Sequence, residues 1–283
     1  MRDYFCGWYF KCQSATHTLA VIPAEHRSKK EQSCSIQLIT DEHAWHVNFP
    51  YDVFRTRKSK PRINIEKNHF SEKGIRLDLT APGLQASGAL SFQALTPIKY
   101  DIMGPFRYVP FMECRHSVVS MNHTVNGTLQ INGMEYRFQD AAGYIEGDRG
   151  CSFPREYAWT QCCFQNGSLM LSVADIPLGR FHFTGIICVI HLCEQEYRLA
   201  TYLGAKAVKI RNGELIIKQG NMMLSAKLLE KNAQPLAAPA KGVMNRIIRE
   251  SASCRAVYRF QKDGQTILDF ETTQASFEYE YAF

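Results

Sequence analysis

Most of the chain alternates between apolar and polar residues with a period of two. The alternation is clear in Ser35–Thr40, Ala44–Phe49 and Ile75–Leu79. Because successive side chains of a strand point to opposite faces of a sheet, this pattern predicts strands that are wet on one side. Helical patterns are scarce. The best candidate for a helix is Val243–Ser253, and the proline-containing run Gln234–Ala240 before it predicts a loop.

Five dipeptides typical of tight turns lie between the predicted strands. Asn-Gly and Asp-Gly adopt positive φ angles easily, which favours a type I′ hairpin. One such dipeptide is weak support, but five together predict an antiparallel β-protein. They are Asn126-Gly127, Asn132-Gly133, Asn166-Gly167, Asn212-Gly213 and Asp263-Gly264. Residues 96–110 contain three prolines and a glycine, so an irregular crossing is expected there.

Strands at short, regular spacing over this length fit either one large sandwich or two barrels in tandem, and two barrels suit the length better. Each half of the chain opens with an aromatic-rich segment, followed by an apolar run that ends in Ile-Pro. The segments are Tyr4–Phe10 and Tyr157–Phe164, followed by Ile22-Pro23 and Ile176-Pro177. This parallel suggests a duplication. We therefore predict an all-β fold of two consecutive antiparallel β-barrels, residues 1–143 and 144–283, with at most one or two short helices.

The composition narrows the class of protein. The chain has 283 residues, 45% of them hydrophobic, which is enough for substantial cores. Lysine and arginine exceed aspartate and glutamate by 33 − 27 = 6, and this mild excess does not indicate a nucleic-acid partner. No apolar run reaches the roughly 20 residues of a membrane span, and the start of the chain lacks a signal-peptide core. We therefore expect a cytoplasmic protein without stable membrane insertion.

The cysteines and the missing catalytic motifs exclude several kinds of chemistry. Ten cysteines are scattered through a chain without a secretory signal, which favours reduced thiols. There is no C-x-x-C pair, so we expect no metal site. A Gly-x-Ser-x-Gly elbow, a phosphate-binding loop and a dinucleotide fingerprint are also absent from the sequence.

The stretch Gly143–Cys162 is the strongest candidate for a functional segment. It combines acids, an arginine, aromatic residues and a glutamine with three glycines and a proline, a composition poorly suited to a plain core strand. Polar, irregular segments of a β-scaffold often carry function. The alternative is a structural connection in which Arg149 pairs with Glu146 or Asp148 and ties two substructures together.

Several separated motifs together resemble the tocopherol cyclase family. They are Tyr4–Lys11, Ile22-Pro23, Tyr144–Pro154, Trp159–Cys162 and Ser172–Pro177. The same motifs are similar to those of lipocalin-like relatives of that family, the carotenoid hydratases and certain Diels–Alder cyclases. The resemblance implies two consecutive lipocalin-like β-barrels, no redox or metal cofactor, and a lipophilic small-molecule ligand. The chain has Glu146-Gly-Asp-Arg-Gly150 where plant-type enzymes have an acid-Lys-Asn-Trp-Gly pattern, and Cys6 where an acid is common.

Cyclisation of the kind that this resemblance implies requires a proton to be delivered to an alkene. A carboxylic acid held in a dry pocket would supply it, and Glu146 and Asp148 are the candidates. Aromatic faces would stabilise the resulting cation, and the candidates are Tyr144, Trp8 and Trp159. Gln161 would orient an oxygen of the substrate, and Arg149 would contribute to ligand binding.

Two histidines precede the candidate segment. His116 is a further candidate for proton donation, and His123 is a candidate for ligand binding. Residues seven apart on a strand point to opposite faces, so His116 and His123 share a site only if a turn or bulge lies between them. The alternative for each is a structural histidine held by hydrogen bonds.

Three functional hypotheses remain open from the sequence. The first is a cofactor-independent cyclase or hydratase acting on a prenylated or otherwise lipophilic molecule. The second is a carrier that binds an apolar ligand without reaction, since β-barrels commonly enclose a cavity. The third is a structural or partner-binding module with a filled interior. An acid buried in a pocket favours the first.

Overall fold

The computed structural model describes residues 3–29, 31–56, 61–110, 112–178, 181–230 and 233–282. Within these ranges the chain is built almost entirely from strands and contains no α-helix. The helical elements are three short 3-10 turns, η1 (Tyr51–Val53), η2 (Gly104–Tyr108) and η3 (Thr201–Leu203). The prediction of an all-β fold is therefore confirmed.

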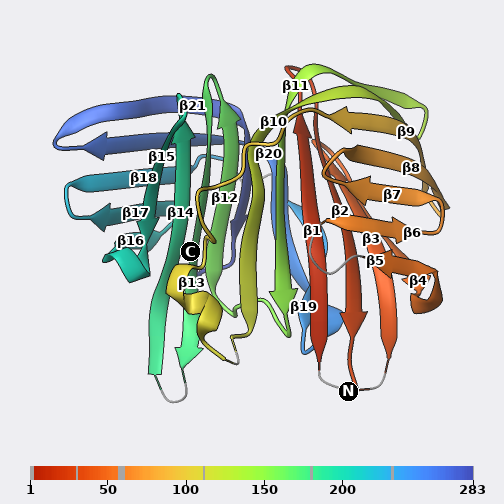
Figure 1. Cartoon of the computed structure of the whole chain (residues 1–283), viewed down its shortest axis with the longest axis horizontal. Coiled ribbons are helices and arrows are strands. Elements are labelled where there is room, and N and C mark those ends of the chain that lie inside the picture. Colours follow the sequence, from red (N-terminus) through yellow and green to blue (C-terminus); the bar gives the residue numbers. More distant parts are fainter. Residues whose placement is uncertain are drawn as a thin grey trace. The chain divides into compact units, whose positions relative to one another are not determined.

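The first eleven strands form one antiparallel sheet, drawn in red to green in Figure 1. Its order is β4-β3-β2-β1-β11-β10-β9-β8-β7-β6-β5, so β1 and β11, from the two ends of this half, lie side by side. The strands are β1 (Tyr4–Gln13), β2 (Thr18–Arg27), β3 (Gln32–Thr40), β4 (Ala44–Pro50), β5 (Phe54–Thr56), β6 (Arg62–Ile65), β7 (Asn68–Ser71), β8 (Gly74–Ala81), β9 (Leu84–Phe92), β10 (Cys114–Ile131) and β11 (Met134–Gly150).

The remaining ten strands form a second antiparallel sheet with a related order, β15-β14-β13-β12-β21-β20-β18-β17-β16, and β19 pairs with β20 beside this path (Figure 1). Here β12 and β21 lie side by side as β1 and β11 do in the first sheet. The strands are β12 (Tyr157–Phe164), β13 (Gly167–Leu178), β14 (Phe181–Leu192), β15 (Gln195–Ala200), β16 (Lys206–Arg211), β17 (Glu214–Gln219), β18 (Met222–Leu228), β19 (Gln234–Ala240), β20 (Val243–Lys262) and β21 (Gln265–Tyr279).

Each sheet has its own hydrophobic core. In the first, Phe10, Ile36 and Ile145 belong to one cluster of buried side chains. In the second, Leu171, Tyr258 and Phe277 belong to another. The chain accordingly divides into two compact units, the first comprising residues 1–98, 113–153 and 236–247, the second 99–112, 154–235 and 248–283. The boundary predicted at residue 143 lies inside β11, and the change of sheet falls between the end of β11 and the start of β12.

Four of the five predicted turns connect neighbouring strands. Asn132-Gly133, Asn212-Gly213 and Asp263-Gly264 have positive φ at both residues, and Asn166 has a φ of 62°. The fifth, Asn126-Gly127, lies within β10 at a register shift. There Asn126 Oδ1 accepts a hydrogen bond from the backbone N–H of Asp140 at 2.8 Å, so the dipeptide forms a bulge instead of a hairpin.

Two local predictions near the C-terminus are wrong. Val243–Ser253 is the first part of the strand β20, in which Ile248 and Glu250 are buried while Ile247 and Arg249 are exposed. Gln234–Ala240 is the strand β19, which pairs with β20 beside the main path of the sheet, so its two prolines do not interrupt a central ladder. The side-chain amide of Gln37 binds both the N–H and the C=O of Ala237 in this strand. Tertiary contacts therefore override the local pattern.

Candidate functional site

The candidate segment forms the second half of β11, where alternation sets the direction of each side chain. Tyr144, Glu146 and Asp148 are two residues apart and point to one face of the first sheet. Ile145, between them, points to the other face and belongs to the hydrophobic core. On the neighbouring strand β10, His116 lies directly opposite Asp148. The acids and the histidine therefore share the face opposite the core.

His116 lies between the two carboxylates. Its Nδ1 is 2.9 Å from Oδ1 of Asp148, and its Nε2 is 3.0 Å from Oε2 of Glu146. The contact with Asp148 has the geometry of a hydrogen bond. The contact with Glu146 has the distance of an ion pair without hydrogen-bond alignment, so its attraction is mainly electrostatic. The side chains of His116 and Glu146 are only 9% and 6% exposed, whereas that of Asp148 is 24% exposed.

Two further groups contact the carboxylates. The hydroxyl of Tyr144 donates a hydrogen bond of 2.5 Å to Oε2 of Glu146, and Tyr144 is completely buried. The thiol of Cys114 donates to Oδ1 of Asp148 at 3.4 Å. Burial, together with the nearby carboxylate of Asp148, raises the pKa of Cys114 well above its ordinary value, so this thiol stays protonated.

The charge of His116 follows from the competition between burial and the two acids. Burial alone lowers the pKa of the imidazole, because it disfavours the charged form. The negative charges of Glu146 and Asp148, together with the hydrogen bond between His116 and Asp148, outweigh burial and hold the pKa of His116 well above 6.5. His116 is therefore an imidazolium at neutral pH, fixed between two acids.

His116, Glu146 and Asp148 also form the group of potential metal ligands found among the described residues. The two nitrogens of an imidazole point in opposite directions, and each faces a different carboxylate here. One ligand atom from each of the three residues lies within 4.8 Å of the other two. Each nitrogen of the ring contacts a carboxylate, and these contacts suit the sharing of a proton.

Arg149 does not have the position that the sequence analysis considered. It follows Asp148 on β11, so its side chain points to the opposite face, and it is exposed. His116 is a cationic partner of both Glu146 and Asp148, and the proposed structural pairing of Arg149 with these acids is wrong.

His123 also lies apart from the cluster. It is opposite Gly143 on β11, on the core face, and its ring packs against Phe92 with centroids 4.6 Å apart. Two register irregularities separate His116 from His123, and the two histidines still point to opposite faces. Nδ1 of His123 is 3.1 Å from Oγ of Ser120, and burial lowers the pKa of His123 to about 4. His123 is therefore neutral and packed within the first unit.

The two candidate tryptophans lie in different units. Trp8 is opposite Gly147 on the core side of the first sheet, where a side chain at Gly147 would collide with the indole. Trp159 is on β12 in the second unit, almost fully buried and opposite Glu278 of β21. Gln161, two residues later, is completely buried, and its Oε1 has no hydrogen-bond partner among the described residues.

The sequence analysis missed two polar features. One is Cys114, which binds Asp148. The other is in the second unit, where the hydroxyl of Tyr157 donates a hydrogen bond to the buried Glu278. An acid inside the alternating run Ala275–Tyr279 was the available signal, because a glutamate on the buried side of a strand requires a partner.

The fold and the buried acid–histidine cluster define an all-β protein with a candidate acid–base centre. Residues 89–279 match the model of the tocopherol cyclase-like family, and since this is more than half of the chain, the protein belongs to that family. A comparison with curated proteins found no match. No helix among the residues described here is long and apolar enough to cross a membrane.

Solved structures share the fold at low sequence identity. CghA in complex with Sch210972 is 11% identical with a TM-score of 0.62, over 98% of this chain and 88% of that one. Kievitone hydratase from Nectria haematococca is 9% identical with a TM-score of 0.58, over 98% and 89%. An AttH protein from Nitrosomonas europaea is 10% identical with a TM-score of 0.55, over 100% and 93%. These likenesses support the predicted lipocalin-like architecture, although the hydrogen-bonded path of neither sheet closes on itself among the described residues.

Proposed function

We propose that the protein is a cofactor-independent cyclase or hydratase that adds a proton to a carbon–carbon double bond of a lipophilic molecule. The observation that carries the proposal is the imidazole of His116 held between Glu146 and Asp148 in a buried cluster. Membership of the tocopherol cyclase-like family and the fold shared with a hydratase are consistent with this class of reaction.

The three groups have different roles in this proposal. Both nitrogens of His116 face carboxylates, so the imidazolium has no N–H directed at a substrate. Asp148 is the most exposed member of the cluster and is the group that meets the substrate. Glu146, fixed by the hydroxyl of Tyr144, contributes to the raised pKa that keeps His116 protonated. His116 is then the proton reservoir, and Asp148 is the acid that it supplies.

The reaction balances within this cluster. His116 passes its Nδ1 proton to Asp148, and the carboxylic acid protonates the alkene to give a carbocation. A hydroxyl of the same molecule attacks the cation in a cyclisation, whereas a water attacks it in a hydration. The proton released from the attacking oxygen goes to the carboxylate of Asp148, which passes it back to Nδ1 of His116, and the cluster regains its starting state.

The first experiment identifies the ligand class and tests for turnover. Mass spectrometry of lipids extracted from the purified full chain gives the ligand class, and prenylated phenols and related polyenes then serve as substrates. We expect Asp148→Asn and His116→Gln to lower kcat by about 10²- to 10⁴-fold, because general acid catalysis contributes that much. The matched control is Glu135→Gln, an exposed acid on the same strand, with kcat unchanged.

Two outcomes would contradict the proposal. Turnover by both cluster variants at the rate of the unmodified protein would remove the acid–base role. Tight binding of an extracted lipid, without conversion of that lipid or of the test substrates, would identify a carrier for an apolar ligand instead.

A further inference from the structure

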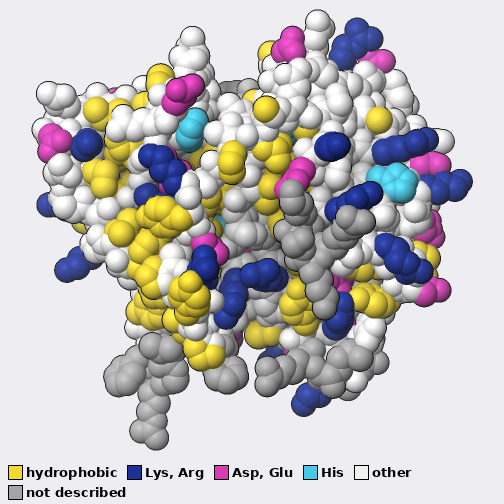
Figure 2. Space-filling model, viewed as in Figure 1, with side chains coloured by type: hydrophobic (Ala, Val, Ile, Leu, Met, Phe, Trp, Pro, Cys, Tyr) yellow, Lys and Arg dark blue, Asp and Glu magenta, His cyan; other side chains and the backbone are white. Residues whose placement is uncertain are grey.

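The second unit exposes a compact group of aromatic and aliphatic side chains around η2 and η3. Tyr108 is 74% exposed, Tyr100 is 49% exposed and Leu203 is 45% exposed. Phe106, which lies between the two tyrosines in the sequence, is half-buried. We call Tyr100, Phe106, Tyr108 and Leu203 the aromatic corner. Figure 2 shows apolar side chains gathered at the lower left, where the yellow coil of Figure 1 marks η2.

Ring contacts connect Phe106 of the aromatic corner to neighbouring aromatic side chains. The ring of Phe106 lies 5.7 Å from that of Phe183 and 5.9 Å from that of Tyr202. Leu203 directly follows Tyr202 in η3. The guanidinium of Arg107 lies over the ring of Tyr108, 4.7 Å from its centroid. Phe106 contacts Tyr202, and Leu203 is the next residue after Tyr202, so Phe106 and Leu203 belong to one local cluster.

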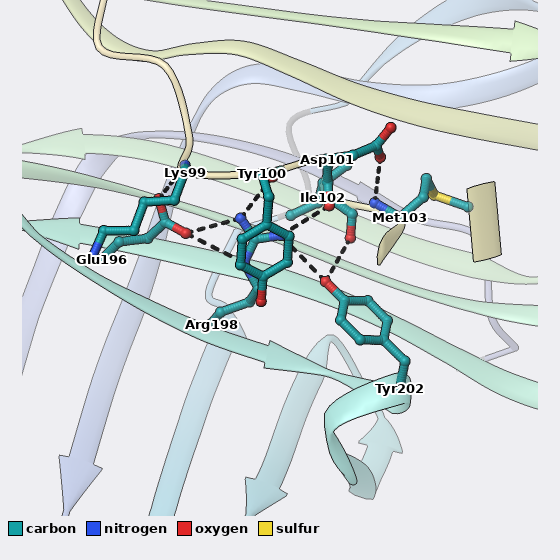
Figure 3. A network of polar contacts seen from close by, with 8 residues as sticks. All are labelled: Lys99, Tyr100, Asp101, Ile102, Met103, Glu196, Arg198 and Tyr202. Atoms are coloured by element: carbon teal, nitrogen blue, oxygen red, sulfur yellow. Dashed lines mark hydrogen bonds and ion pairs between the residues drawn. The ribbon is translucent and has the colours of Figure 1, made fainter. Parts of the chain in front are cut away.

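Arg198 holds the aromatic corner in place. Its guanidinium lies 3.7 Å from the centroid of Tyr100, and it donates hydrogen bonds to the backbone carbonyls of Tyr100 at 2.9 Å and Asp101 at 3.1 Å (Figure 3). It also donates to the hydroxyl of Tyr202 and forms an ion pair with Glu196. Arg198 thus fixes the backbone of Tyr100 and Asp101, just before η2.

Tyr202 and Glu196, which both contact Arg198, also bind the segment before η2. The hydroxyl of Tyr202 donates to the carbonyl of Ile102 at 3.1 Å, and Oε2 of Glu196 accepts from the backbone N–H of Lys99 at 2.8 Å (Figure 3). Gly104 has a φ of 52°, and its Cα lies so close to the ring of Tyr202 that no side chain fits there. A rigid scaffold therefore presents the exposed tyrosine and leucine, and little conformational entropy is lost when they bind.

Positive charge surrounds the aromatic corner. Segments 99–108 and 201–206 contain three cations, Lys99, Arg107 and Lys206, and one acid, Asp101, a balance of 3 − 1 = +2. All three cations are exposed. The edge strand β16 continues the same character, because Lys206, Val208, Lys209 and Arg211 are all exposed on it.

We propose that the aromatic corner docks the protein on an anionic lipid surface. Tyrosine rings prefer the boundary between headgroups and acyl chains, where the ring is in an apolar environment and the hydroxyl remains wet. Exposed lysines and arginines next to the rings are attracted by anionic headgroups. The inference is independent of the proposed function.

Vesicle co-sedimentation of the full chain tests this inference. The probes are phosphatidylcholine vesicles and vesicles in which phosphatidylserine replaces part of the phosphatidylcholine. We expect binding to the anionic vesicles that weakens as salt is added. The double variant Tyr108→Ser with Leu203→Ser should bind on the order of tenfold more weakly, since it removes the apolar contact. Arg107→Glu should weaken binding to the anionic vesicles on the order of tenfold and should leave binding to phosphatidylcholine vesicles unchanged.

The control is the double variant Met134→Ser with Ile247→Ser, which removes two exposed apolar side chains from the first unit. It should bind vesicles like the unmodified protein, and thermal melts verify that every variant is folded. If the unmodified protein bound neither kind of vesicle, the proposal would be overturned. Equal binding by the Tyr108 and Leu203 variant would overturn it as well. Sedimentation that reveals a dimer abolished by that variant would assign the surface to a second copy of the chain.

Discussion

The two units each bury a cation among acids and tyrosines, with different consequences. In the first unit, His116 contacts only two carboxylates, and both of its nitrogens are used in doing so. In the second unit, Arg198 binds Glu196 together with two backbone carbonyls and a tyrosine hydroxyl. The charges of Arg198 and Glu196 are almost completely buried, whereas Asp148 of the first cluster is 24% exposed. The difference lies in which cation gives up its proton.

Arginine stays protonated at any pH at which the protein is folded, so the second cluster can only hold parts of the chain together. Burial opposes the charge of Arg198, but Tyr202 and Glu196 outweigh it and raise the pKa further. Histidine can lose its proton while the chain stays folded, so the first cluster can release and regain a proton even though the two acids raise the pKa of His116. The comparison indicates that a buried ionic network becomes a candidate catalytic site only where its cation is titratable.

The largest expected effect comes from removing the permanent cation. Arg198→Ala leaves Glu196 buried without its ion pair and frees the segment before η2, so the free energy of unfolding should fall by about 3–5 kcal/mol. Arg137→Ala, which breaks an exposed pair with Glu135, is the matched control and should cost less than about 1 kcal/mol. Urea denaturation of the full chain measures both. Equal losses in the two variants would show that Arg198 is not the structural element described above.

A smaller effect is expected when the same network is disturbed without removing a charge. Gly104→Ala places a Cβ 2.5 Å from the ring of Tyr202 at a residue with positive φ, which should cost about 2–4 kcal/mol. Gly83→Ala is the control, because Gly83 also has positive φ but nothing lies within 4 Å of its Cβ position. It should cost about 1 kcal/mol from backbone strain alone. Thermal melts of both variants measure the difference, and a cost at Gly83 as large as at Gly104 would exclude the ring contact as the cause.

The repeating local patterns made most of the fold predictable. Period-two alternation and the Asn-Gly and Asp-Gly dipeptides identified the strands and four hairpins, because both signals act over a few residues. The hairpin turn predicted at Asn126-Gly127 is wrong, because a hydrogen bond between Asn126 and Asp140 makes this dipeptide a bulge. The helix predicted over Val243–Ser253 is wrong, because its adjacent isoleucines suit a helix as well as a strand. The pairing of β20 with β19 and with β21 decides between these two structures.

The candidate site was predictable only in part. Alternation along β11 places Tyr144, Glu146 and Asp148 on one face, and the same rule already places Arg149 on the other. The contact between His116 and Asp148 depends on the register of two strands whose paired residues lie 32 positions apart, which local sequence does not encode. The role of Arg198 had no local signal at all, because its carbonyl partners are almost 100 residues away.

The smallest expected effect is the pH dependence of the stability that His116 contributes, which Arg198 should not show. Because the pKa of His116 is above 6.5 in the folded chain, the folded state binds this proton more tightly than the unfolded state does. The resulting stabilisation is complete below about pH 6.5 and is lost as the pH rises through the folded pKa, by at most about 1.4 kcal/mol per pH unit. His116→Gln removes this contribution. The stability difference between the unmodified protein and His116→Gln should therefore shrink as the pH rises.

Two other buried histidines set the lower limit of the useful pH range. Burial lowers the pKa of His26 and of His123 to about 4, so both resist protonation and reduce stability as the pH falls below 6.5. They are present in both proteins and cancel in the difference, as does the permanently charged Arg198. Unfolding free energies in urea at a series of pH values measure this difference. A difference that stays constant or grows with pH would mean that His116 does not carry the titratable charge on which the contrast with Arg198 rests.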